Sequence, residues 1–346
     1  MNKIYRSRAP LRLGLAGGGT DVSPYSDIHG GAILNATISL YAYVDIEVTN
    51  DGIIHFEAKD LECIECYPIG QTFDTDGKLN LLKGVYNRIM KDHPFEHNGL
   101  KIMTLVQAPP GSGLGSSSTL VVALIGAFVG MLNLPMGEYD IAHYAYDIER
   151  VDLQLAGGKQ DQYAATFGGF NYMEFYGNDK TIVNPLRIKP EYIYELEKNI
   201  VLYYTSKSRQ SADIIQEQVK NVRSNNAASI EAMHQLKKQS VMMKEALLRG
   251  ELDQIGKILD FGHNHKKNMA TQISNENLDK IYTDAIRAGA TGGKISGAGG
   301  GGFMMFYCPG TTRYDVIKAL EKFRGQNMPF LFTREGLTYW TGTIGA

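Results

Sequence analysis

The first half of the chain alternates short apolar runs, which are typical of strands, with longer apolar stripes at helical spacing. Residues 41–48 alternate apolar and polar side chains in the manner of a half-buried strand. The same criteria predict strands at residues 8–15, 31–37, 41–48, 53–58, 61–67, 101–107, 170–176 and 200–205, and helices at residues 79–91, 116–132, 139–155 and 160–167.

The helix predicted at residues 139–155 has one apolar face, which we expect to be buried. This face consists of Ile141, Ala145, Ile148, Val151 and Leu155. Glu149 lies on another face in this prediction. Residues 120–132 form a continuous apolar run that is too short to cross a bilayer, so they predict a buried core helix.

Beyond residue 211 the pattern becomes mostly helical and then alternates again. It predicts helices at residues 212–223, 227–248, 252–268, 277–288 and 314–323, strands at residues 302–307 and 329–333, and a connection at residues 185–190. This mixture predicts an α+β fold. With 346 residues the chain is long enough for two medium domains.

The overall charge argues against two classes of partner. A net charge of -2 and a pI near 6.5 provide no basic field for nucleic acid or for an anionic membrane, which favours small-molecule substrates. The N-terminus lacks the apolar core of a signal peptide, and three cysteines are too few for a disulfide framework. We therefore expect a cytoplasmic protein, and the sequence leaves a homodimer possible.

Residues 108–119 read Ala-Pro-Pro-Gly-Ser-Gly-Leu-Gly-Ser-Ser-Ser-Thr, a glycine loop between a predicted strand and a predicted helix. Gly111, Gly113 and Gly115 allow positive φ angles, so successive N–H groups can converge on phosphate oxygens. The helix that begins near Ser116 adds its partial positive end. The hydroxyls that follow can cap the helix, contact phosphate or reach Mg²⁺, and a plain turn before a core helix is the alternative.

Two familiar nucleotide motifs do not fit. A Walker loop needs a lysine after its last glycine, and none follows Gly115. Residues 297–302 have the spacing of a dinucleotide fingerprint, but the apolar run that follows them predicts a strand instead of the required helix. We therefore discard both motifs.

Three charged residues have positions that suit chemistry. Asp161 lies in the first turn of a predicted helix after two glycines, where it can be a general base, an anchor for a hydroxyl or a helix cap. Glu149 is either a solvated carboxylate or, if the two helices flank one cleft, a Mg²⁺ ligand. Arg12 alternates with apolar neighbours, so it requires either an anion or an acidic partner.

Four segments together resemble the GHMP kinase superfamily, which includes galactokinase, homoserine kinase, mevalonate kinase and phosphomevalonate kinase. They are residues 8–21, 109–119, 157–162 and 297–302, in the family's order across nearly the whole chain. The resemblance implies an N-terminal, ATP-binding domain of the ribosomal protein S5 type at residues 1–190 and a ferredoxin-like domain at residues 191–346. ATP and its acceptor would meet between them.

The resemblance also implies roles for individual residues. The ATP phosphates would lie against Pro110, Gly111, Ser112, Gly113, Leu114, Gly115, Ser116, Ser117 and Ser118. Ser117 would share Mg²⁺ with Glu149. Asp161 would act on the acceptor hydroxyl as base or orienting charge, and Arg12 would lie near the transferred phosphoryl group.

The first segment departs from galactokinases, which have Gly-Glu-His-Thr-Asp where residues 17–21 read Gly-Gly-Gly-Thr-Asp. This form resembles the branch with bacterial D-glycero-D-manno-heptose 7-phosphate kinases and fucokinase domains. Lys159, with Lys207 and Arg209, favours an acceptor that already bears a phosphate, although Lys159 can instead simply balance Asp161. The residues expected to hold the acceptor are Gly18, Gly19, Thr20, Asp21, Lys159, Arg209, Gly299 and Gly300.

The expected reaction is transfer of the ATP γ-phosphoryl group to O1 of heptose 7-phosphate, giving the 1,7-bisphosphate used for nucleotide-activated heptose. A fucokinase-like or other sugar 1-kinase, an isoprenoid-pathway kinase and a non-catalytic sugar-binding protein of the same fold remain alternatives.

Overall fold

The computed structural model describes residues 2–206 and 211–344, and two long antiparallel strands form its centre. These strands are β1 (Asn2–Ala16) and β2 (Gly31–Val48). The same sheet contains β3 (Ile53–Ala58), β4 (Cys63–Pro68), β5 (Leu100–Val106), β6 (Phe170–Phe175), β7 (Thr181–Pro185) and β12 (Thr338–Ile344). Its main path is β12-β1-β2-β5-β3-β4, and β6 joins β7 to β2. The two strands predicted at residues 31–37 and 41–48 are therefore one.

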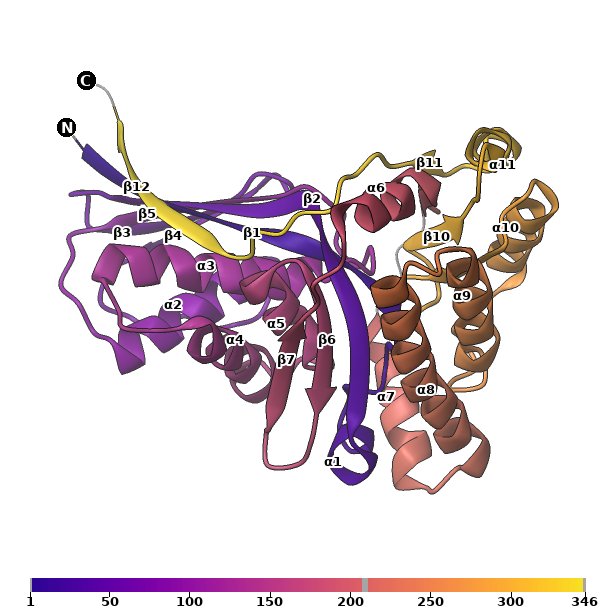
Figure 1. The fold of residues 1–346 in the computed structure, drawn as a ribbon. Coiled ribbons are helices and arrows are strands. Elements are labelled where there is room, and N and C mark those ends of the chain that lie inside the picture. The colour runs from indigo at the N-terminus through magenta and orange to yellow at the C-terminus, as the bar shows by residue number, and fades with distance from the viewer. Residues whose placement is uncertain (1, 207–210, 345–346) are drawn as a thin grey trace.

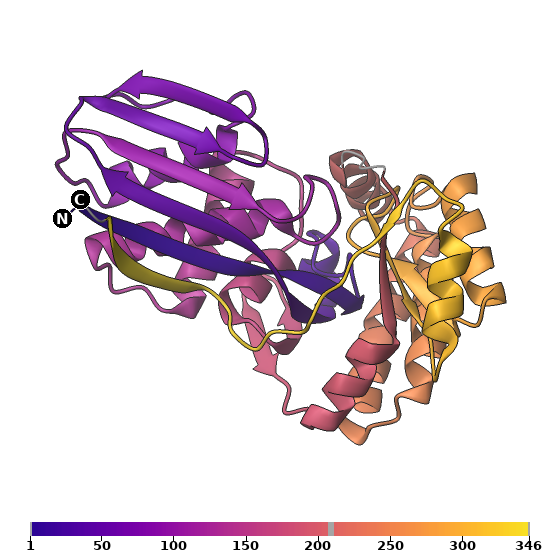
Figure 2. The same cartoon turned by 90° about the horizontal axis from the view of Figure 1, so that it is seen from above.

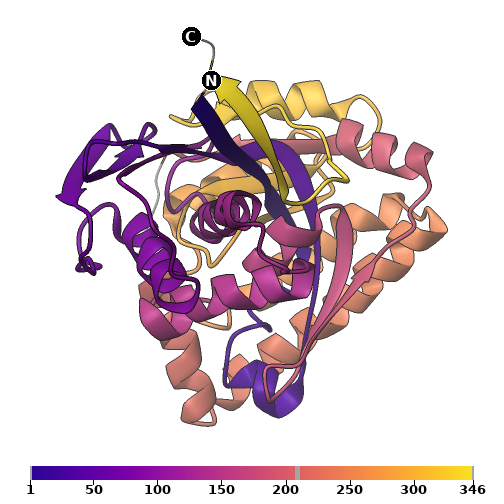
Figure 3. The ribbon, with the colours of Figure 1, turned by 90° about the vertical axis from the view of Figure 1, so that its left-hand side faces the viewer.

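Helices lie on one face of this sheet (Figure 1, Figure 3). They are α2 (Asn80–Asp92), α3 (Ser116–Leu132), α4 (Glu138–Asp147) and α5 (Gln160–Phe167), and the short α1 (Tyr25–His29) precedes β2. The α3 helix contacts β1 and β2 as well as α2, α4 and α5. Because it is apolar on all sides, it forms the buried core helix that the sequence predicts. Among the described helices, none is long and apolar enough to cross a membrane.

The second half of the chain builds a smaller antiparallel sheet with helices beside it. It comprises α6 (Pro190–Asn199), β8 (Ile200–Tyr204), α7 (Ser211–Arg223), α8 (Ala227–Arg249), α9 (Asp253–Lys266), α10 (Glu276–Arg287), β9 (Gly292–Ile295), β10 (Phe303–Tyr307), α11 (Thr312–Leu320) and β11 (Gln326–Asn327). The strand order is β11-β8-β10-β9. The predicted connection lies between Pro185, the end of β7, and Pro190, the start of α6.

The C-terminal segment differs from the sequence prediction. The strand predicted at residues 329–333 is absent from the described structure, where Phe332 forms only an isolated bridge to Ile38. The chain instead runs back from the second half to the first sheet, where β12 pairs with β1 next to the N-terminus (Figure 2). The last strand thus joins the sheet built from the first half of the chain. For the rest of the chain, the predicted domain boundary at residue 190 stays a prediction.

A π-helical turn at Ile148–Asp152 interrupts the helix predicted at residues 139–155. Leu153 donates its N–H to the Ile148 carbonyl, five residues back, so the turn is wider than an α-turn. The wider turn rotates the side chains that follow. Val151, predicted to be buried, is 63% exposed, whereas Glu149 is only 1% exposed.

Candidate active site

The glycine loop before α3 has the conformation that its sequence predicts. Gly111, Gly113 and Gly115 have φ angles of 68°, 81° and 76°. The α3 helix begins at Ser116, and among the described residues no side chain caps it. The first N–H groups of this helix therefore have no intrahelical acceptor and form a ready site for an anion.

The glycine block at residues 297–302 lies directly against this loop. A Cβ atom on Gly113 would lie 2.5 Å from the Ser296 carbonyl oxygen, and one on Gly297 would lie 2.6 Å from the Gly113 Cα atom. The Ser296 hydroxyl donates to the Gly113 carbonyl at 2.7 Å. Gly299 and Gly300 contact Ile273 instead, because the Gly300 N–H donates to its carbonyl at 2.8 Å.

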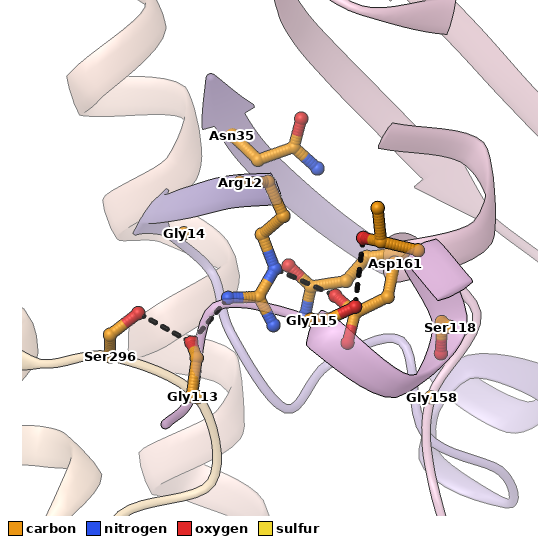
Figure 4. Close-up of polar contacts among 12 residues, drawn as sticks. Arg12, Gly14, Asn35, Gly113, Gly115, Ser118, Gly158, Asp161 and Ser296 are labelled. Atoms are coloured by element: carbon orange, nitrogen blue, oxygen red, sulfur yellow. Dashed lines mark hydrogen bonds and ion pairs between the residues drawn. The ribbon is translucent and has the colours of Figure 1, made fainter. Parts of the chain in front are cut away.

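Arg12 and Asp161 form an ion pair over the loop (Figure 4). Arg12 Nε donates to Asp161 Oδ1 at 2.7 Å, and Arg12 Nη1 donates to the Gly113 carbonyl at 2.6 Å. Asp161 adjoins the start of α3, since a Cβ atom on Gly115 would lie 3.1 Å from its Cγ atom. The Arg12 side chain is 5% exposed and the Asp161 side chain 24%, so the carboxylate is the more accessible partner. Of the two alternatives for Arg12, the acidic partner is present as Asp161, and the pair lies beside the expected anion site.

Asp21 extends this cluster toward the first glycine segment. Its carboxylate is buried and accepts a hydrogen bond at 3.1 Å from the N–H of Gln160, which is the residue before Asp161. Burial, and then the nearby Asp161 carboxylate, raise the pKa of Asp21. The Thr20 hydroxyl, predicted to hold the acceptor, lies 2.8 Å from the Gly17 carbonyl oxygen and braces the loop.

The remaining glycines of this segment lie close to the second half of the chain. A Cβ atom on Gly18 would lie 3.9 Å from Lys266 Nζ, and one on Gly19 would lie 2.6 Å from Met269 Cε. A side chain at position 19 would therefore displace the Met269 side chain at the contact between the two halves, whereas a Cβ atom at position 18 has room.

Glu149 is buried next to the start of α3. It accepts hydrogen bonds from the Ser118 hydroxyl at 3.0 Å and from Gln162 Nε2. Ser117, the expected magnesium ligand, is exposed on the same turn and does not bond Glu149 in the described structure. Glu149 therefore contacts the helix that contains Asp161, through Gln162, and its role as a magnesium ligand stays a prediction.

Lys159 is balanced by acids other than Asp161. Its ammonium group lies 2.9 Å from Asp179 Oδ1 and 3.9 Å from Asp27 Oδ1. Burial is the largest single influence and would lower the pKa of Lys159, but the hydrogen bond to Asp179 and the charges of Tyr146, Asp179 and Asp27 together outweigh it, so the pKa is raised. Contact between Lys159 and the acceptor stays a prediction. Lys207 and Arg209 lie outside the described residues.

Two buried lysines at the site were missed from the sequence. Lys266 donates to the Gly297 carbonyl, and Lys294 donates to the Gly14 carbonyl at 2.5 Å. Burial and the nearby Arg12 lower the pKa of Lys266 to about 8, and burial, Lys266 and Arg12 lower the pKa of Lys294. Lys294 could have been noticed, because it is the only charged residue between Arg287 and Arg313 and lies shortly before the glycine block. Lys266 has no such signal within its predicted helix.

The lowered pKa of Lys266 predicts a pH dependence. We expect kcat/KM to fall as pH rises through about 8, because the neutral amine attracts phosphate less than the ammonium form. Arginine stays charged in this range, so Lys266→Arg should move the decline to higher pH. The measurement is a pH profile of kcat/KM across neutral and alkaline pH.

The neighbouring Lys267, which pairs with Asp279 at 2.6 Å, provides the control Lys267→Arg. An unchanged alkaline limb in Lys266→Arg would rule out this lysine as its source. The free energy of unfolding should depend on pH in the opposite direction to kcat/KM. Because the pKa of Lys266 in the folded protein is below the ordinary 10.5, its contribution to the free energy of unfolding is full above pH 10.5 and is lost as pH falls through about 8. Unfolding measured in parallel therefore separates the two effects.

A cavity of about 730 Å³ opens beside Asp21. Its lining comes from the Asp21 loop, from α4 and the π-helical turn, from residues 155–157, and from α7. Because Asp21 also bonds the residue before Asp161, the cavity adjoins the acidic end of the site.

The comparisons with known proteins agree with this geometry. Residues 80–169 match the GHMP kinases N terminal domain, and residues 243–326 match the GHMP kinases C terminal domain. The chain is 48% identical to a D-glycero-alpha-D-manno-heptose 7-phosphate kinase of Campylobacter jejuni over 98% of its length and 99% of the relative's. It is 27% identical to the bifunctional fucokinase/GDP-fucose pyrophosphorylase of Arabidopsis thaliana over 86% of this chain and 29% of that protein.

The crystal structure of a D-glycero-D-manno-heptose 1-phosphate kinase from Bacteroides thetaiotaomicron has a TM-score of 0.84 and 46% identity, covering 99% of this chain and 100% of the other. The predicted α+β, two-part GHMP kinase fold is confirmed by these matches. On its sequence and on its fold, the chain belongs to the GHMP kinase family.

Proposed function

We propose that this protein transfers the γ-phosphoryl group of ATP to the anomeric O1 hydroxyl of D-glycero-D-manno-heptose 7-phosphate. The observation that carries the proposal is the Arg12–Asp161 pair beside the uncapped start of α3. Asp21 lies close to this pair, because it accepts a hydrogen bond from the N–H of Gln160, the residue before Asp161. An anion site, a cation and an accessible carboxylate are what phosphoryl transfer to a hydroxyl requires. The relative from Campylobacter jejuni supports this choice of acceptor.

In the proposed reaction, the acceptor oxygen bonds to the γ-phosphorus while the bond from that phosphorus to the β,γ-bridging oxygen breaks. ADP leaves with the bond's electron pair, and the proton of the hydroxyl passes to Asp161. Arg12 Nε donates to this carboxylate at 2.7 Å and so holds it in place. Its second bond, to the Gly113 carbonyl, fixes the acid relative to the phosphate loop.

We further propose that Glu149 and a serine at the start of α3 hold the Mg²⁺ that accompanies ATP. Glu149 is a buried carboxylate that lies 3.7 Å from the Arg150 guanidinium, and the Ser118 hydroxyl donates to it at 3.0 Å. One carboxylate with hydroxyl and phosphate oxygens is a donor set that Mg²⁺ accepts, so the residues fit the ion. When bound, Mg²⁺ neutralises charge on the phosphates.

The test compares ATP turnover with heptose 7-phosphate, fucose, galactose and mannose as acceptors. We expect turnover with heptose 7-phosphate, and phosphorus NMR of the product should show a second phosphate on C1. Activity confined to an unphosphorylated sugar would overturn the proposed acceptor but would still support kinase activity. Sugar binding without turnover of any acceptor would identify a non-catalytic sugar-binding protein.

A further inference from the structure

The cavity beside Asp21 is rich in positive charge. The described residues that line it include three bases, Arg150, Lys220 and Arg223, and one acid, Asp21. Lys220 and Arg223 are three residues apart in the last turn of α7, so they share one face of that helix. Three cations around one cavity create a potential that attracts an anion.

Lys220 and Arg223 have charges that are free to meet a ligand. Both are exposed, and neither side chain forms an ion pair or hydrogen bond with any other residue in the described part of the chain. Lys159, in contrast, is buried between two carboxylates. In the described part of the chain, the lining cations without an acidic partner are therefore the two of α7, whereas Arg150 lies 3.7 Å from the Glu149 carboxylate.

Arg150 supplies a fixed cation to the same cavity. Its Nη2 donates to the Gly158 carbonyl at 3.2 Å, and its Nη1 lies 3.4 Å from the Leu155 carbonyl oxygen. A Cβ atom on Gly157 would lie 2.2 Å from Nη2, so the guanidinium packs directly on this glycine. Among the described residues, its buried Nε atom has no hydrogen-bond partner. Arg150 thus joins the cavity to the segment that leads to Asp161.

We propose that Lys220, Arg223 and Arg150 form the subsite for the phosphate that the acceptor already bears. This inference rests on the proposed function, whose acceptor is a sugar phosphate. Asp21 lines the same cavity and bonds the Gln160 N–H. A sugar phosphate in the cavity is therefore held by its phosphate at the cations, with its ring near Asp21 and the catalytic acid. The subsite selects phosphorylated over neutral sugars.

Kinetics of Lys220→Met, Arg223→Met and the double variant test the subsite. The acceptors are D-glycero-D-manno-heptose 7-phosphate and the same heptose without phosphate. Loss of a charge-assisted hydrogen bond should raise KM for the sugar phosphate about 10-fold in each single variant and about 100-fold in the double variant. We expect kcat, the KM of ATP and the turnover of the unphosphorylated sugar to stay at the wild-type level.

Lys257→Met removes the same charge from an exposed position on α9 outside the cavity, and it should behave as wild type. The subsite is overturned if the KM for the sugar phosphate is unchanged in the double variant, or if KM rises equally for both sugars. The proposed function still holds in that case, provided that the wild-type enzyme phosphorylates heptose 7-phosphate. Calorimetry distinguishes the reverse case. Wild-type protein that binds the sugar phosphate without phosphorylating it, with binding lost in the double variant, supports the subsite and overturns the function.

Discussion

Replacing Asp161 by Asn should lower kcat by about 100- to 10,000-fold, the range that a positioned acid or base contributes. The amide has the shape of the carboxylate and can still accept the hydrogen bond from Arg12 Nε, but it cannot take a proton or hold a negative charge. ATP affinity should be largely kept, because the loop and the start of α3 are unchanged. Steady-state kinetics and ATP titration of the same samples measure both quantities.

Glu335→Gln is the matched control for this substitution. Glu335 Oε2 lies 2.7 Å from Arg8 Nη2, and Arg8 precedes Arg12 on the same strand, β1, but this pair is at the surface. We expect wild-type turnover, since exposed ion pairs contribute little to stability. Thermal unfolding of the Asp161 variant belongs in the same experiment, because the substitution leaves the buried Arg12 without its acidic partner. Wild-type turnover in Asp161→Asn would remove this residue from the mechanism.

The parts of the site that sequence could predict depend on local chemistry. Gly111, Gly113 and Gly115 adopt positive φ because other residues rarely can, so the loop conformation follows from residue type. Asp161 lies in the first turn of a helix, Gln160–Phe167, whose limits two pairs of glycines already mark. Its partner could not be read from the chain, because Arg12 is 149 residues away.

The parts that sequence missed depend on tertiary contacts. Lys266 looks like an ordinary solvated lysine in the sequence and Lys294 differs only by its isolation from other charges, yet both are buried in the folded chain. The π-helical turn changes the helical phase by a single residue, which inverted the expected exposure of Glu149 and Val151. The strand β12 was missed because its pairing with β1 crosses the length of the chain, whereas the segment predicted as a strand at residues 329–333 is extended but has no ladder in the described structure.

Replacing Gly113 by Ala should reduce both stability and activity. The φ angle of 81° is strained for alanine and costs about 1 to 2 kcal/mol. The new Cβ atom would also lie 2.5 Å from the Ser296 carbonyl oxygen, and relief of such an overlap costs about 1 to 3 kcal/mol more. Relief requires the loop to separate from Ser296, which displaces its N–H groups, and a misplacement of about 1 Å can lower turnover about 100-fold.

Gly77→Ala separates the two causes. Gly77 has nearly the same φ, 78°, but a Cβ atom there would meet nothing within 4 Å. Chemical denaturation should therefore show only the backbone cost of about 1 to 2 kcal/mol, with full activity. The prediction is wrong if the two variants have equal free energies of unfolding and Gly113→Ala has normal turnover. The loop could then move away from the Ser296 backbone without loss of stability or activity. The expected difference between the variants instead measures how strongly the second half of the chain fixes the phosphate loop that the first half supplies.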